Sequence, residues 1–182
     1  MPDRLPERLV RAVELLDVGA EEHILEVGCG PGVAAALVCE RLGRGRLTAI
    51  DRSSTAIERA RKRNTAALAA GKLDLRRINL ADLEPAGGER FDAILAVNVN
   101  LFWTGPAEAE LTVLARTLRP GGRVVLVYET PRGTLRERAL TAIENGLRAH
   151  GFVVRTVATP PVVAVLGHLP RTIDEMRTFG SP

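Results

Sequence analysis

Amphipathic stretches and short apolar runs alternate along this chain. Leu5, Leu9, Val13 and Leu16 recur at helical spacing with charged residues on the other faces, which predicts an amphipathic helix within residues 1–20. Later runs rich in β-branched residues predict strands, and the segments between them predict helices. The expected strands are 23–27, 46–50, 73–78, 91–97, 123–128, 152–157 and 162–166, and the expected helices are 33–42, 54–70, 106–118 and 134–150.

This alternation predicts an α/β fold: a doubly wound, mostly parallel seven-stranded sheet with helices on both faces. The last two strands are separated only by residues 158–161, whereas a parallel crossover needs about a dozen residues. We therefore expect the last strand to be antiparallel. No repeat or linker divides the chain, so residues 1–182 should form one domain ending in a tail at 169–182.

A glycine-rich turn follows the first expected strand, where residues 26–32 read EVGCGPG. Glycines let the backbone approach a ligand closely, and we expect N–H groups of this loop and of the next helix to face a small charged ligand. The dinucleotide pattern GxGxxG would need a third glycine at Val33, and no Gly-Lys-Ser/Thr follows for a phosphate loop. Both of those nucleotide sites are therefore disfavoured.

Composition sets the class of protein. With 182 residues, 46% of them hydrophobic and 26% charged, the chain matches one globular domain. No apolar window reaches the roughly 18 residues of a membrane span, and the charged start MPDRLPER does not resemble a secretory signal, so we expect a cytoplasmic protein. Cys29 and Cys39 indicate neither a disulfide framework nor a metal site. Cys29 is either a reactive thiol or, as we favour, a small loop filler.

The net charge of +3 raises the question of an anionic partner. Of the 25 basic residues 23 are arginine, and they are spread along the sequence, which makes nucleic acid a less favoured partner. The densest run, residues 59–63, lies in the expected helix 54–70. A solvated helix face is the favoured explanation for it.

These motifs resemble the class I S-adenosylmethionine-dependent methyltransferase family, which has a Rossmann-like sheet. Its first motif, acid-x-Gly-x-Gly-x-Gly, matches Glu26 to Gly32 at every position. Asp51 after the second strand, Asp82 after the third and the LRPGGR turn at 118–123 match in the same order. The resemblance covers roughly residues 23–128, and the closing antiparallel hairpin agrees with it.

The resemblance implies S-adenosyl-L-methionine as cofactor. A carboxylate at Asp51 could accept hydrogen bonds from both ribose hydroxyls, and Asp82 with the N–H of Leu83 could read adenine. Taken singly, Asp51, Asp82 and Asn98 could also cap a helix, begin a turn or close a strand. Their joint position after successive strands favours a binding site. The cofactor-binding residues expected are Glu26, Gly28, Cys29, Gly30, Asp51, Arg52, Asp82, Leu83 and Asn98.

A sulfonium donor carries an activated methyl group, so the protein needs mainly to align a nucleophile and exclude water. A catalytic base is optional, and the candidates are Tyr128, Glu129 and His168.

The segment 98–103 follows the fourth strand, and its Asn100, Phe102 and Trp103 are candidate substrate-facing residues. Packing of the following helix explains the two aromatic residues equally well. The segment lacks the NPPY and DPPY motifs that family members acting on adenine or glutamine amides often carry. The chain leaves little room for a substrate-recognition domain, which favours a small-molecule acceptor. The alternatives are an RNA or protein methyltransferase and a non-catalytic partner protein that binds S-adenosylmethionine.

Overall fold

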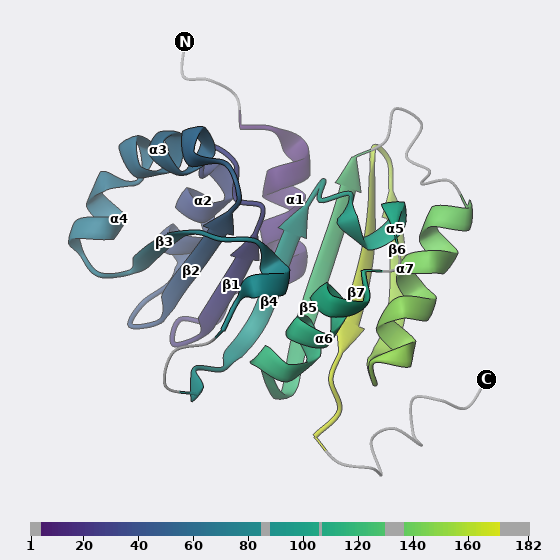
Figure 1. Cartoon of the computed structure of the whole chain (residues 1–182). Helices are drawn as coiled ribbons and strands as arrows, with labels where there is room; N and C mark the ends of the chain where they lie inside the picture. Colours follow the sequence, from purple (N-terminus) through teal and green to yellow (C-terminus); the bar gives the residue numbers. More distant parts are fainter. Residues whose placement is uncertain (1–4, 85–87, 106, 130–136, 172–182) are drawn as a thin grey trace.

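A single seven-stranded sheet organises the molecule (Figure 1). The computed structural model describes residues 5–84, 88–105, 107–129 and 137–171. The strand order is β3-β2-β1-β4-β5-β7-β6, and β7 runs antiparallel to both β5 and β6. The expected fold class is confirmed. The strands are β1 (His23–Val27), β2 (Arg46–Asp51), β3 (Leu73–Arg77), β4 (Phe91–Val97), β5 (Leu118–Glu129), β6 (Val153–Thr159) and β7 (Val162–His168).

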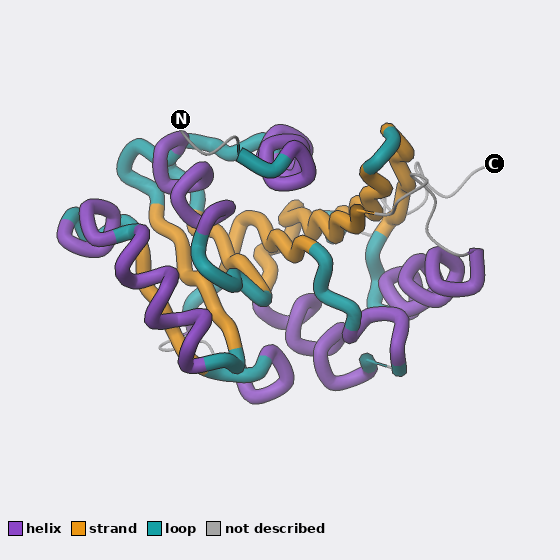
Figure 2. The backbone as a smooth tube through the Cα atoms, turned by 90° about the horizontal axis from the view of Figure 1, so that it is seen from above, coloured by secondary structure: helices purple, strands orange, loops and turns teal. Residues whose placement is uncertain are grey.

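Helices cover both faces of this sheet, which forms the middle layer when seen from above (Figure 2). Successive strand residues enter different cores: Ile24 packs in the core beneath α1, α2 and α3, and Leu25 packs in the core beneath α6 and α7. None of the described helices combines the length and apolarity that a bilayer crossing needs. The helices are α1 (Glu7–Leu16), α2 (Val33–Arg41), α3 (Ser54–Arg63), α4 (Thr65–Ala69), η1 (Leu80–Asp82, a 3-10 turn), α5 (Leu101–Thr104), α6 (Glu108–Thr117) and α7 (Glu137–Ala149).

The expected helix 54–70 is in fact two helices that break at Asn64. The buried Asn64 side chain donates from Nδ2 to the carbonyl oxygens of Gly32 and Ala60, both at 2.9 Å. Its backbone leaves helical geometry, with φ −110° and ψ 30°. Periodicity did not reveal this break because it comes from a contact with a loop 32 residues away.

Two further features differ from expectation: the start of β5 and the presence of α5. The strand begins at Leu118 rather than at residue 123, because Leu118 pairs with Phe91 before an irregularity in the β4–β5 register. The short helix α5 was not expected, since four residues are too few to establish a helical period.

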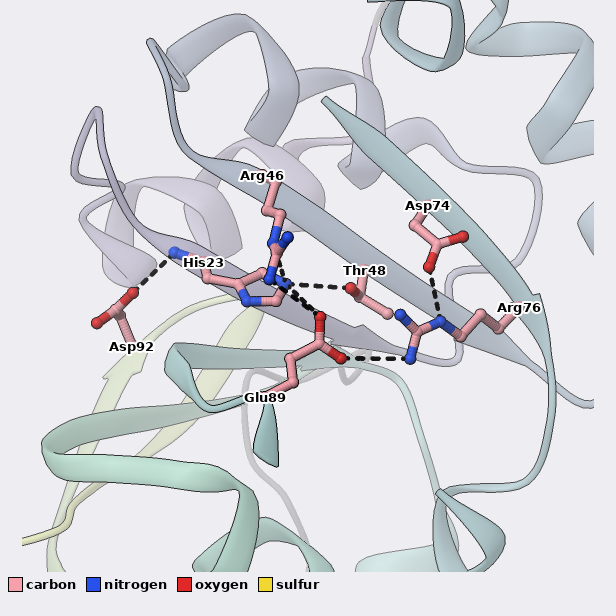
Figure 3. A network of polar contacts seen from close by, with 7 residues as sticks. All are labelled: His23, Arg46, Thr48, Asp74, Arg76, Glu89 and Asp92. Carbon is pink, nitrogen blue, oxygen red and sulfur yellow. Dashed lines mark hydrogen bonds and ion pairs between the residues drawn. The ribbon is translucent and has the colours of Figure 1, made fainter. Parts of the chain in front are cut away.

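A polar network around the largely buried side chains of His23 and Glu89 connects β1, β2 and β3 (Figure 3). Glu89, whose side chain is 10% exposed, approaches Arg46 at 3.3 Å and Arg76 at 3.4 Å. Burial, reinforced by the charge of Arg46, lowers the pKa of His23 to about 4. His23 is therefore neutral near pH 7, and its 3.3 Å contact with Glu89 is not an ion pair there. The side chains of His23, Arg46 and Glu89 thus contact one another at the edge of the sheet where β1 and β2 begin.

Candidate functional site

The register of the parallel strands brings three predicted site residues to one edge of the sheet. Val27 pairs with Ile50 on β2 and with Ala96 on β4. The residues that follow these pairs, Gly28 and Asp51, therefore lie close to the end of β4, where Asn98 follows. In open α/β sheets this carboxyl edge is where ligands bind.

The glycine loop is fastened to β2 by its own N–H groups. Gly28 and Cys29 donate to the Ile50 carbonyl oxygen at 2.8 and 3.0 Å, and Gly30 donates to Oδ2 of Asp51 at 2.9 Å. The expectation that these N–H groups face a ligand is therefore wrong. The carboxylates around this loop remain the candidate ligand-binding groups.

Two loop glycines are required by packing. Gly28 has φ +70°, and a Cβ there would lie 2.7 Å from Cγ2 of Val99. Gly32 has φ +74°, and a Cβ there would lie 2.5 Å from Nδ2 of Asn64. Any other residue at either position would meet both backbone strain and a clash.

A cavity of about 720 Å³ opens at this edge of the sheet. The sequence did not single out Asn79, Thr104 and Glu110, which also line it. Asn79, like Asp51, is a polar residue directly after an expected strand, so the same sequence pattern could have identified it. Thr104 and Glu110 reach the cavity only through the packing of α5 and α6. The predicted residues that line the cavity are Gly28, Asp51, Arg52, Asp82, Asn98 and Asn100.

Asp51 and Asp82 both present carboxylates to the cavity while making local hydrogen bonds. Asp51 accepts from Gly30 through Oδ2 and from the N–H of Ser53 through Oδ1, at 2.9 Å each. Asp82 accepts from Nδ2 of Asn79 at 2.9 Å through its Oδ2. Each carboxylate oxygen can accept more than one hydrogen bond. Both side chains can therefore support the local fold and bind a ligand.

Leu83 does not fit its expected role. Its N–H donates to the Leu80 carbonyl oxygen at 3.1 Å, which closes the 3-10 turn, and its side chain is buried. Its carbonyl oxygen accepts from Nη2 of Arg116 at 2.9 Å. The backbone of Leu83 is thus already engaged, and the expected contact from its N–H to adenine is not available.

Glu26 is a buried acid beneath the glycine loop. The residue is 3% exposed, and within the described part of the chain its Oε2 has no hydrogen-bond partner. Burial, with a smaller effect of the Asp51 charge, raises the pKa of Glu26 to about 8. An unpartnered acid under the loop, together with the carboxylates of Asp51 and Asp82, suits a cationic ligand. The residues at this edge fit S-adenosylmethionine, which carries a sulfonium and an ammonium group.

Cys29 and Cys39 are free and buried. Burial raises the pKa of the Cys29 thiol, and the nearby Glu26 and Asp51 charges raise it further. Burial also raises the pKa of Cys39 to about 11. These environments disfavour a thiolate, so Cys29 is better explained as a loop filler than as a nucleophile. In the described residues, no cluster of three or more His, Cys, Asp or Glu side chains could hold a metal ion.

Asn98 is held in an unusual conformation at the end of β4. It has φ +55° without being glycine. Its N–H donates to the Val127 carbonyl oxygen at 2.8 Å, and its Oδ1 accepts from the N–H of Glu129 at 2.9 Å. These bonds from β5 stabilise a backbone that would otherwise be strained, and strained residues gather at functional sites.

The three candidate bases have different surroundings. Tyr128 is buried, which raises its pKa, and its hydroxyl donates to the Val99 carbonyl oxygen at 3.2 Å. Glu129 accepts from Nη1 of Arg8 on α1 at 2.9 Å. His168 pairs with Arg123 of β5, which in turn pairs with Ala93 near the start of β4, so it lies at the opposite edge of the sheet. The position of His168 does not support a role in this site. The hydrogen bond of Tyr128 supports a different role for that residue, which is to hold Val99 in place.

The candidate substrate wall is divided between cavity and core. Asn100 lines the cavity. Phe102 is 3% exposed and packs in the core with α6 and α7, so packing explains it better than substrate contact does. Trp103 lies on α5, and its side chain is outside the described part of the structure.

Comparisons with known proteins agree with this geometry. A family model described as a methyltransferase domain matches residues 24–122. Trans-aconitate 2-methyltransferase of Paracidovorax citrulli is 30% identical, with 94% of this chain and 67% of that protein covered. Nocamycin O-methyltransferase of Saccharothrix syringae is 33% identical, with 94% and 59% covered. The chain spans about half to two thirds of the length of the first curated relatives it matches.

Solved structures share the fold. A SAM-dependent methyltransferase from Aquifex aeolicus superimposes with a TM-score of 0.73 at 19% identity, with 93% of this chain and 94% of that chain covered. At this identity the match supports the architecture alone. The sheet order and the closing hairpin are thus those of a known class of enzymes.

Proposed function

Because this chain belongs to the class I S-adenosylmethionine-dependent methyltransferase family, we propose that it binds S-adenosyl-L-methionine and transfers its methyl group to a small-molecule acceptor. The observation that carries this proposal is the cavity at the carboxyl edge, with Asp51 and Asp82 in its wall and the unpartnered Glu26 beneath the adjoining loop. These acids match the hydroxyl, amine and cationic groups of that cofactor.

Each of these residues has a distinct task in the proposal. Asp51 accepts hydrogen bonds from the ribose hydroxyls, and Asp82 accepts from the adenine amine. Glu26 stabilises the positive charge at the methionine end from below the loop. Asn98 fixes the end of β4 beside the methyl group. The proposed binding segment also includes Cys29, Gly30 and Arg52. Gly30 contributes by holding Asp51 in place.

The cofactor, when bound, supplies an activated methyl group. The protein then has to hold the acceptor in line and keep water away, which requires no buried proton acceptor. If the acceptor loses a proton on transfer, Glu129 is the candidate with an exposed carboxylate at this edge, although it must first release Arg8. Tyr128, with its raised pKa, would remain protonated and in place.

The small-molecule acceptor is supported by the relatives whose printed names give one, trans-aconitate and nocamycin. The cavity volume of about 720 Å³ lies in the range of small-molecule sites and has to hold both cofactor and acceptor. A cytoplasmic location belongs to the same proposal, because two free thiols suit a reducing compartment.

Calorimetry with S-adenosylmethionine and with its demethylated product tests the proposal. We expect micromolar binding of at least one of them, weakened by about 1 to 3 kcal/mol in Asp51→Ala. The control is Asp74→Ala, which removes an exposed carboxylate paired with Arg76, away from the cavity. Absence of binding to the wild-type protein, or equal losses in both variants, would contradict the proposal.

A further inference from the structure

A groove beside the glycine loop is lined by basic side chains that the proposed function does not use. Arg59, Lys62 and Arg63 of α3 surround it together with Pro31 of the loop, and its volume is about 610 Å³. All three basic residues are exposed. In the part of the chain that the structure describes, the side chains of Arg59 and Lys62 make no hydrogen bond and no ion pair.

The net charge of helix α3 equals that of the whole chain. Helix α3 contains four basic residues and one acid, a net +3, and the full sequence also has a net charge of +3. The remainder of the chain is therefore balanced. Elsewhere many arginines are matched by acids, as in the pairs of Arg123 with Glu22 at 2.7 Å and of Arg148 with Glu144 at 3.2 Å.

Helix stability explains only part of this pattern. Arg61, Lys62 and Arg63 occupy the last turn of α3, where cations stabilise the helix dipole. Arg59 lies one turn earlier and gains little from that effect. Arg63 donates from Nε to the Pro31 carbonyl oxygen at 3.1 Å, so it reaches across to the loop instead of capping its own helix.

We propose that this groove, formed by Pro31, Arg59, Lys62 and Arg63, is a docking site for an acidic segment of a partner protein. Residues three and four apart share one helix face, so Arg59, Lys62 and Arg63 form a cluster that several carboxylates can pair with at once. Such pairing gives specificity and a fast encounter rate through charge complementarity.

The small number of cations in the cluster favours a protein partner over RNA. Three cations can neutralise about three phosphates, whereas nucleic-acid binding commonly uses roughly six to ten phosphate contacts. None of the four residues that line the groove is aromatic, so bases would find no stacking surface there.

The proposed docking groove is also connected to the glycine loop by hydrogen bonds. Arg63 contacts Pro31, and the next residue, Asn64, donates to the Gly32 carbonyl oxygen at 2.9 Å. An acidic segment on α3 would therefore lie against the turn that holds the proposed cofactor site. Its binding should be visible at the backbone amides of that turn.

The test uses a fluorescently labelled oligoglutamate peptide and, in parallel, a labelled oligoadenylate RNA, with anisotropy measured across a salt series. We expect the wild-type protein to bind the peptide at low salt and lose it as salt rises. The double variant Arg59→Glu with Lys62→Glu should bind at least about tenfold more weakly. The matched control is Arg138→Glu with Arg155→Glu, which makes the same change in net charge on α7 and β6.

Mapping where the peptide binds completes the test. Nuclear magnetic resonance titration of the labelled protein with the peptide should shift the amides of α3 and of Gly30 and Gly32. Lack of peptide binding, or equal weakening in the control variant, would overturn the proposal. Tighter binding of the RNA than of the peptide through the same two side chains would also overturn it. None of these outcomes depends on cofactor binding or methyl transfer.

Discussion

The N–H of Gly30 donates to Oδ2 of Asp51 at 2.9 Å, so the middle of the glycine loop is tied to the acid that ends β2. The other oxygen of the carboxylate accepts from the N–H of Ser53 at the start of α3. One side chain thus joins a loop, a strand end and a helix start. An alanine variant therefore removes its proposed binding role and its structural role together.

Asparagine at position 51 keeps part of the structural role. Its single acceptor oxygen can satisfy one of the two N–H groups, of Gly30 and Ser53, whereas alanine satisfies neither. We expect Asp51→Asn to lower the free energy of unfolding by about 1 kcal/mol, and Asp51→Ala by somewhat more. Urea denaturation of both variants measures the difference. Identical stability of Asp51→Ala and wild type would show that the loop does not rely on Asp51.

Gly28→Ala should destabilise the protein through two effects, the positive φ of +70° and a Cβ 2.7 Å from Cγ2 of Val99. We expect a loss of about 2 to 4 kcal/mol in the free energy of unfolding. Gly71→Ala is the matched control, because Gly71 has φ +68° with nothing within 4 Å. It should lose only the part due to backbone strain, about 1 kcal/mol. Thermal and urea unfolding distinguish the two variants.

A second substitution tests the steric part by itself. Val99→Ala removes the methyl group that the new Cβ would meet, so it should recover part of the stability lost in Gly28→Ala. The single variant Val99→Ala is measured beside them, and a double variant whose loss equals the sum of the two single losses would assign the whole effect to backbone strain.

Glu26 should make stability depend on pH. Its pKa is about 8 in the folded protein and 4.5 as the unperturbed value, so the folded state holds the proton more tightly. The associated stabilisation is complete below pH 4.5 and is lost as pH rises towards 8. Glu26→Gln lacks this dependence. We expect its stability relative to wild type to increase across this window by a few kcal/mol, as measured by urea denaturation at several pH values.

The same ionisation should be coupled to cofactor binding. A cationic ligand favours the charged carboxylate, so binding of S-adenosylmethionine should release a proton at neutral pH, and its affinity should rise as pH approaches 8. Calorimetry in buffers of different ionisation enthalpy detects that proton. An affinity independent of pH, with no proton release, would place the positive charge away from Glu26.

Tyr128 should behave as a positioning residue. Tyr128→Phe removes the hydroxyl that donates to Val99 and leaves the ring in the core. We expect a loss of about 1 kcal/mol in stability and a weaker affinity for the cofactor, with an unchanged pH dependence of that affinity. A change in the pH dependence would mean that the Tyr128 hydroxyl titrates in the working range, against its raised pKa.

Much of the fold could be predicted because the sheet imposes strong local patterns. Short buried apolar runs mark β1, β2 and β4. The gap of 158–161 between the last two expected strands, which is 160–161 between β6 and β7 in the structure, leaves room only for an antiparallel turn. The break at Asn64 could not be predicted in this way. It depends on a hydrogen bond to Gly32, which only the folded chain brings near.

The positions of the candidate site residues could be predicted where a residue type follows a strand end, and less well where hydrogen bonding or packing decides. Asp51, Asp82 and Asn98 lie where their positions after strands predict. The N–H of Leu83 closes the turn at Leu80 and is not available to a ligand. For Phe102 the structure favours core packing, the second of the two explanations that the sequence left open. His168 lies away from the cavity because β7 runs antiparallel, which places its last residue beside Arg123 of β5.

A crystal structure of the protein with the demethylated cofactor tests the central claim most directly. We predict that the ligand lies in the cavity at the carboxyl edge of the sheet, with its ribose on Asp51 and its adenine near Asp82. The methionine end should lie by Gly28 and Asn98, above Glu26. A ligand bound elsewhere, or a ribose that makes no contact with Asp51, would contradict the account.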